Sequence, residues 1–274
     1  MGRVLPGEPT RLVRRALAEL KAEHQVRLRA IRERERTSIH VLTGDAVWAL
    51  DATHLLRDEL GEALQAEVLR DVASTRTIGL SIGPPATQAD VIGLLERTRR
   101  ERGVLPMVLM TDNGGPYVGK QLAAWLREHE VVHLRNLQRT PQHNACAEHG
   151  IGELKADALV DYWPSGLPCG AALALLCESA TRLDLHRPRA TRGWRTAVQV
   201  DAELPPARRR VRRARFHAAA RCALREAVLD CHGARARRRA EREAILNNLE
   251  RFNLIRRTRG GVPRCRHSRK ETRA

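Results

Sequence analysis

Short apolar runs bounded by turn-forming residues dominate the first half of the chain. The segments "AVWALDAT" (46–53), "ALQAEVLRDVAS" (63–74) and "TRTIGLSI" (75–82) have the length and composition of strands. Only short connections separate them, and this favours antiparallel pairing between neighbours. The pattern therefore predicts a three-stranded antiparallel unit.

Helices and strands are expected to alternate after this unit. Residues 88–102 and 120–129 have helical patterns, whereas the apolar run at 107–110 and "VVHLR" (131–135) have the length of strands. Three antiparallel strands followed by such alternation predict an α/β fold with a mixed five-stranded sheet flanked by helices. Residues 8–37 are charged and favour a helix, which predicts a helical arm at the amino end.

Composition narrows the class of protein. At 274 residues and 42% hydrophobic content, the chain can bury one sizeable core. No apolar segment has the length of a membrane span, and no signal peptide is apparent. The six cysteines show no CxxC pair, so a zinc or disulfide framework is not expected. These features predict a soluble protein of the cytoplasm with no membrane partner.

Positive charge is concentrated at the carboxyl end. The segment from Pro205 onward holds 22 Lys and Arg but only six Asp and Glu, so it accounts for nearly all of the net charge of +17. Such a segment suits contacts with phosphates, and a solvated tail without a partner is the alternative. Because the arginine runs lack an apolar face, nucleic acid is favoured over a membrane. The arginines predicted to contact DNA are Arg208, Arg209, Arg210, Arg212 and Arg213.

Three acids occur in contexts that favour chemistry. Asp112 ends the apolar run of "VLMTDNGGPY", where a turn follows, and Asp51 follows the apolar run 47–50. Ligand sites in α/β sheets lie at such strand ends, although an Asp that bonds turn amides is the simpler alternative. Glu148 lies in a predicted helix with Lys155 on the same face. Sixty residues separate the first two acids, and 35 separate the second from Glu148.

The segments "WALDAT", "TDNGGPY" and "TPQHNACAEHGIGELK" resemble the catalytic core of the DDE transposases and retroviral integrases. The D, D(35)E arrangement falls on Asp51, Asp112 and Glu148. "LHRPRATRGWRTAVQV" (185–200) is similar to the segment that follows the core in bacterial insertion-sequence transposases. The resemblance extends over residues 40–200 and implies an RNase H-like fold.

The resemblance also implies cutting and joining of DNA strands by in-line phosphoryl transfer. Two Mg²⁺ ions are implied, with Mn²⁺ as a substitute, and hard cations of this kind prefer oxygen ligands. By analogy, Asp51 bridges both ions, while Asp112 and Glu148 each hold one. The implied partners are mobile-element ends and target DNA in the bacterial nucleoid, with a homo-oligomer assembled on the DNA.

Two neighbouring residues receive secondary roles. Asn144 is predicted to orient the Glu148 loop or to contact DNA, and a helix cap is the alternative. Lys155 is predicted to contact a phosphate near the cut site, and a solvated surface lysine is the alternative.

The predicted domains are a helical arm (1–40), an RNase H-like integrase core (41–200) and a basic, largely helical carboxyl segment (201–274). The arm is shorter than the helix-turn-helix region usual in insertion-sequence transposases. Two other functions therefore stay open: a non-catalytic or truncated DNA-binding derivative of a transposase, and a nuclease that hydrolyses DNA without joining it. Metal dependence separates the enzyme from the binder.

Overall fold

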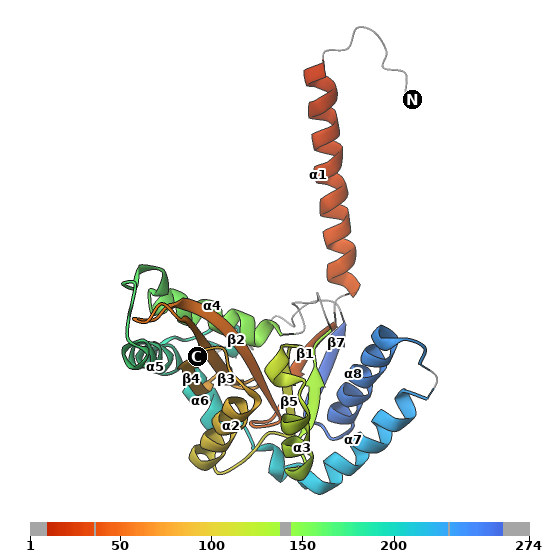
Figure 1. Cartoon of the computed structure of the whole chain (residues 1–274). Coiled ribbons are helices and arrows are strands. Elements are labelled where there is room, and N and C mark those ends of the chain that lie inside the picture. The colour runs from red at the N-terminus through yellow and green to blue at the C-terminus, as the bar shows by residue number, and fades with distance from the viewer. Residues whose placement is uncertain (1–9, 36, 138–143, 230, 260–274) are drawn as a thin grey trace, which may run out of the picture. The chain divides into compact units, whose positions relative to one another are not determined.

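The computed structural model describes residues 10–35, 37–137, 144–229 and 231–259. The first residues of the "TPQHNACAEHGIGELK" motif and the basic residues beyond 259 lie outside these ranges. One compact unit comprises His40–Arg256, and the second comprises Met1–Ile39 with Arg257–Ala274. In the second unit, α1 (Thr10–Glu35) confirms the predicted helical arm (Figure 1).

A mixed five-stranded sheet forms the centre of the larger unit (Figure 1). The strand order is β4-β3-β2-β5-β6, in which β2–β3 and β3–β4 are antiparallel and β2–β5 and β5–β6 are parallel. The strands are β2 (Val47–Arg57), β3 (Ala63–Asp71), β4 (Thr77–Gly83), β5 (Val108–Thr111) and β6 (Val132–Arg135). The predicted mixed sheet is thus confirmed, with all five strands close to their predicted positions.

Two helices cover one face of the sheet. α2 (Gln88–Arg102) begins with a capping box between Thr87 and Asp90 and ends at Gly103, whose φ of 67° suits a residue without a side chain. α3 (Lys120–Glu128) follows β5. Both confirm the predicted helices. The buried residues that pack together on this face include Trp48, Leu50, Leu109, Leu94, Leu95, Leu122 and Leu126.

The alternate residues of the same strands pack on the opposite face, as the two-residue period of a strand requires. Helices α7 (Arg213–Ala227) and α8 (Ala234–Arg251) supply the other half of this cluster. Its buried members include Val47, Ala49, Val108, Met110, Val132, Phe216, Ala220, Ile245 and Leu249. The carboxyl-terminal helices therefore belong to the same core as the sheet.

The predicted boundary at residue 200 consequently falls inside one compact unit, His40–Arg256. The apolar positions of α7 and α8 repeat at four-residue spacing, as in Phe216 and Ala220 and in Ile245 and Leu249. Arginines surround these positions in the sequence, so composition suggested a separate basic segment. Spacing, rather than average charge, determines which face of a helix is buried.

The remaining elements complete the unit. α4 (Ala145–Asp157) and α5 (Cys169–His186) pack over β3 and β4 through residues such as Val68, Ile151 and Leu176. One short helix, α6 (Ala197–Glu203), and the 3₁₀ segments Gly115–Tyr117, Val160–Tyr162, Ala190–Arg192 and Ala207–Arg209 lie in the connections between the larger elements. β1 (Thr37–Val41) and β7 (Ile255–Arg259) pair as a two-stranded sheet. No helix among the described residues is long and apolar enough to cross a membrane.

Candidate active site

Asp51 and Asp112 lie on neighbouring parallel strands. In the register of β2 and β5, Ala49 is opposite Met110, and each acid follows two residues later. β5 ends at Thr111, so Asp112 marks the point where this strand meets its turn. Asp51 lies within β2, which continues to Arg57, but it is level with the end of β5, so the two acids are neighbours across the two strands.

Asp51 is a half-buried carboxylate with two hydrogen-bond donors. The Asn144 side-chain amide donates to its Oδ2 at 2.9 Å, and the Ala52 N–H donates to its Oδ1 at 3.0 Å. Burial raises the pKa of Asp51 to about 7, and the nearby negative charges of Asp112 and Glu148 act in the same direction. The structure therefore brings the three predicted acids within electrostatic range of one another.

Asp112 also accepts a hydrogen bond from a backbone amide of the turn that follows it, which was the simpler alternative to a role as a ligand. The Gly114 N–H donates to Asp112 Oδ1 at 2.8 Å. A carboxylate has two oxygens and several lone pairs, so this bond is compatible with a second role as a ligand. The turn holds the carboxylate in a fixed orientation at the end of β5.

Glu148 comes from helix α4, in its first turn. Its backbone N–H donates to the Asn144 carbonyl at 3.0 Å, while its side chain is exposed. An exposed side chain can change rotamer rapidly. The third acid is thus carried by a helix beside the sheet rather than by the sheet itself.

A buried arginine determines how closely α4 approaches the sheet. Arg70 on β3 is buried and donates to the Cys146 carbonyl oxygen at 3.0 Å. A Cβ at Gly150 would lie 1.5 Å from Arg70 Nη1, so only glycine fits where this guanidinium crosses the helix. Lys155 links the same helix to β2, because its Nζ donates to the His54 carbonyl at 3.1 Å. Lys155 therefore has a structural bond beside its predicted contact with DNA.

Asn144 occupies the N-cap position of α4 without making a side-chain cap hydrogen bond. Its amide donates to Asp51 instead. Its Oδ1 atom is buried and has no hydrogen-bond partner among the described residues. The cap alternative is not what the structure shows, and Asn144 belongs to the site by direct contact with a predicted metal ligand.

The donor atoms can be tested against a divalent cation. Within the described residues, no group of three or more His, Cys, Asp or Glu side chains is already arranged to hold a metal ion. The carboxylates of Asp51 and Asp112 and the partnerless Oδ1 of Asn144 are nonetheless oxygen donors, which Mg²⁺ prefers. A cation would also reduce the repulsion that raises the pKa of Asp51. The chemistry of these oxygen atoms therefore fits a hard cation.

A fourth acid beside the site was missed by the sequence analysis. Glu67 on β3 is paired with Ala52 in the sheet register and is only 3% exposed. The Tyr117 hydroxyl donates to one of its carboxylate oxygens, and the Gln65 amide donates to the other at 2.8 Å. Burial raises the pKa of Glu67, and the charge of Asp112 adds to this effect. An acid inside the apolar strand pattern of 63–71 was the available signal.

A polar network extends from Asp112 toward α8 and was also missed. The Asn113 amide donates to the Asn136 carbonyl at 2.7 Å, and Arg238 donates to the Asn113 side-chain oxygen. Arg242 Nη1 lies 3.3 Å from Asn136 Oδ1. Helix α8 thus reaches the carboxyl ends of β5 and β6, next to the predicted catalytic acids.

The arginines predicted to contact DNA lie elsewhere. Arg208, Arg209, Arg210 and Arg212 are exposed, whereas Arg213 donates to the carbonyl oxygens of Leu105 and Pro106 just before β5 begins. A backbone hydrogen bond joins Ala207 to Gly44, ahead of β2. This stretch is therefore at the amino ends of the parallel strands and is not brought together with the three acids.

Comparisons with known proteins identify the fold. No protein-family model and no curated protein matches the chain. A chain of the simian T-cell lymphotropic virus intasome in complex with PP2A regulatory subunit B56 gamma is 19% identical, with a TM-score of 0.50 over 61% of this chain and 58% of that chain. This match spans less than two thirds of the viral chain.

Two further solved structures are similar. The HTLV-2 integrase catalytic core domain in complex with magnesium (trimeric form) is 17% identical, with a TM-score of 0.48 over 59% of this chain and 99% of that chain. The catalytic core domain of BIV integrase is 16% identical, with a TM-score of 0.45 over 58% and 95%. At sequence identities this low, structural similarity is evidence for a shared fold only. The chain has the RNase H-like fold of retroviral integrase catalytic cores.

Proposed function

We propose that the chain is a DDE-type transposase that cuts and joins DNA strands at the ends of a mobile element. The observation that carries this proposal is the convergence of Asp51, Asp112 and Glu148 from three separate elements. Their mutual repulsion helps to raise the pKa of Asp51 to about 7. Acids that repel one another in a folded protein cost stability, and such an arrangement is typical of functional sites.

The residues have distinct roles in this proposal. Asp51 and Asp112 would hold Mg²⁺, or Mn²⁺ as a substitute, and Glu148 would complete the ligand set. Bound cations of this type supply activation of a water or a DNA 3′-hydroxyl and stabilise charge on the leaving oxygen. Asn144 orients the Asp51 carboxylate by its 2.9 Å hydrogen bond. Arg70 holds α4, and with it Glu148, against the sheet.

DNA is the partner that fits the charge of the chain. The net charge is +17, and most of this excess comes from the carboxyl-terminal residues. Positive charge of this size attracts the phosphate backbone regardless of base sequence. Joining two ends of one element brings two sites together, so we also propose a homo-oligomer assembled on DNA in the bacterial nucleoid.

A second function has one observation in its favour. The side chain of Glu148, the third acid of the set, is exposed. A DNA-binding protein derived from a transposase would need its arginines but no cation. The two functions predict different responses to Mg²⁺ and to substitution of the acids.

A joining assay tests the proposal. Purified protein is incubated with Mg²⁺, a target plasmid and a labelled duplex taken from the DNA that flanks its own coding sequence. We expect joined product from the natural protein. We expect a decrease of about 10³-fold or more in Asp51→Asn, Asp112→Asn and Glu148→Gln, because metal ligands contribute several kcal/mol to the transition state.

Glu128→Gln is the matched control, because Glu128 is an exposed acid at the end of α3, just before β6 begins, and so lies toward the amino ends of the parallel strands. It should join DNA at the natural rate. Bound but chemically unchanged DNA in every sample would favour the non-catalytic function. Cleaved but unjoined DNA would indicate a nuclease.

A further inference from the structure

A basic pocket opens where helix α8 begins, next to the end of β6. Its volume is about 420 Å³. Both the backbone at the start of α8 and the side chains of its first turns contribute to the wall. The lining residues are Arg135, Gly233, Ala234, Arg237, Arg238 and Glu241.

The charge of this pocket favours an anion. Three arginines face one acid, Glu241, and none of these arginines forms an ion pair within the part of the chain that the structure describes. Arginine presents a planar fork of donors that matches the oxygens of a phosphate. The pocket contains no Phe, Tyr or Trp on which a base could stack. Its chemistry thus suits the backbone of a nucleic acid rather than its bases.

The pocket is connected to the candidate active site by direct contacts. Arg238 lines the pocket and donates to the side chain of Asn113, the residue after Asp112. Arg135 is opposite Thr111 in the register of β6 and β5. A phosphate in this pocket would therefore lie at the same edge of the sheet as the three acids.

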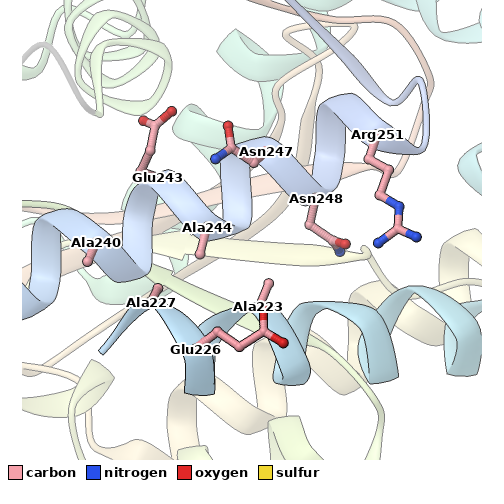
Figure 2. Close-up of a pocket in the computed structure, with 9 residues that line it drawn as sticks. All are labelled: Ala223, Glu226, Ala227, Ala240, Glu243, Ala244, Asn247, Asn248 and Arg251. Carbon is pink, nitrogen blue, oxygen red and sulfur yellow. The ribbon is translucent and has the colours of Figure 1, made fainter. Parts of the chain in front are cut away.

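A second cavity differs from the basic pocket in the charge of its lining residues (Figure 2). It has a volume of about 530 Å³ and lies between α7 and α8, where small side chains separate the two helices. Two acids and one arginine line it, so its charge disfavours a phosphate. Its lining residues are Ala223, Glu226, Ala227, Ala240, Glu243, Ala244, Asn247, Asn248 and Arg251.

We infer that the pocket of Arg135, Arg237 and Arg238 holds a backbone phosphate of the DNA strand, beside the phosphodiester that reacts at the three acids. The inference rests on the proposed function, because it takes DNA as the substrate. In this inference, the protein–phosphate contact nearest to the three acids is made at the start of α8 and not by residues 208–213. Since only phosphate is recognised, the contribution to binding is independent of base sequence.

A salt titration tests this site without any chemistry. The dissociation constant of a fluorescent duplex is measured by anisotropy with the full chain in EDTA, over a range of KCl concentrations. The test variant is Arg135→Ala/Arg237→Ala, which leaves the Arg238 contact with Asn113 in place. We expect about tenfold weaker binding for each arginine, on duplexes of unrelated sequence. The slope of log K against log salt should decrease by about one, because the contact with one phosphate is lost.

Arg239→Ala is the matched control, because Arg239 is exposed on the same helix and does not line the pocket. Its slope should change by less than that of either single pocket variant, Arg135→Ala or Arg237→Ala. Equal weakening by Arg239→Ala, or a pocket variant that binds like the natural protein, would overturn the inference. Thermal melting establishes that each variant is folded.

Two further results separate this inference from its alternatives. If inorganic phosphate stabilises the natural protein but not the double variant, while the DNA slope is unchanged, the pocket binds a small anion and the inference is wrong. The titration is made in EDTA, so its result does not depend on the metal-dependent reaction. If the natural protein does not join DNA but the double variant shows the expected change in slope, the phosphate site is supported and the proposed function is wrong. If the natural protein joins DNA but the slope is the same in the double variant, the proposed function is supported and the phosphate site is wrong.

Discussion

The two ends of the parallel strands both carry arginines, but they use them differently. At the amino ends, Arg213 donates to the Leu105 and Pro106 carbonyl oxygens, and Arg102 pairs with Asp45 and Asp201. At the carboxyl ends, Arg135 and Arg237 line a pocket beside the candidate active site. The first set completes the fold, whereas the second set lines the pocket proposed to bind a phosphate.

The number of basic residues in a segment therefore does not show what each side chain contacts. The run 208–213 has the highest local density of arginine in the sequence, yet Arg213 is committed to backbone carbonyls. Arg135 stands alone in an apolar strand and lines the pocket. The partners of each guanidinium distinguish the two roles.

Arg102→Ala should produce the largest change in stability. The buried Asp45 would lose its counter-charge, which costs about 3–5 kcal/mol when a buried pair is broken, whereas Asp201 would keep its ion pair with Arg76. Urea unfolding followed by circular dichroism measures this loss. Arg237→Ala, at the other end of the strands, should leave the midpoint unchanged. Equal midpoints for Arg102→Ala and the natural protein would remove the distinction between the two ends.

Asn144→Ala should weaken the candidate metal site at the carboxyl ends. The variant lacks both the amide that donates to Asp51 and the buried Oδ1. Loss of a residue that orients a ligand usually decreases metal affinity or activity by about 10–100-fold. The Mg²⁺ concentration that gives half of the maximal thermal stabilisation should increase accordingly. Gln121→Ala on the exposed side of α3 is the control, and a matching midpoint in both variants would contradict the assigned role.

Acidification should affect the two ends with opposite sign. Burial raises the pKa of Asp71, which accepts from the Asp45 N–H at the amino end, from 3.8 to about 6. Its contribution to stability is therefore present below pH 4 and is lost as the pH rises through 6. Burial lowers the pKa of His133, which contacts Thr111 near the carboxyl end, from 6.5 to about 4. Its contribution is present above pH 6.5 and is lost as the pH falls.

Urea unfolding between pH 4 and 7 checks these signs with Asp71→Asn and His133→Gln. Relative to Asp71→Asn, the natural protein should lose about 2–3 kcal/mol as the pH rises across this range. Relative to His133→Gln, it should gain a similar amount. Two differences of the same sign would show that burial does not govern both groups.

The central elements could be predicted from the sequence because their signals are local. The run before Asp112 forms a strand that is buried on both faces, and a capping pair and a terminal glycine delimit α2. The three acids could be located because each adjoins a distinctive local motif. A resemblance in short motifs was sufficient to predict the RNase H-like sheet, which the structure confirms.

The rest of the site depends on contacts between distant parts of the chain. Asn144 and Asp51 are 93 positions apart, and Arg238 and Asn113 are 125 apart. No local pattern encodes such pairs, so Glu67 with Tyr117 and Arg135 with α8 were missed. The packing of α7 and α8 was missed for a related reason: their few apolar residues are spread among many charged ones.

Helix α8 also has a genetic consequence. Its buried face, with Ile245 and Leu249, fills the hydrophobic cluster under the sheet, while its arginines reach the strand ends. A stop codon ahead of this helix would remove the proposed phosphate contacts together with the residues that α8 buries in the core. We expect such an allele to yield no folded protein, rather than a folded protein that has lost only its affinity for DNA. The proposed DNA contact and the folding of the core would thus be lost in the same mutation.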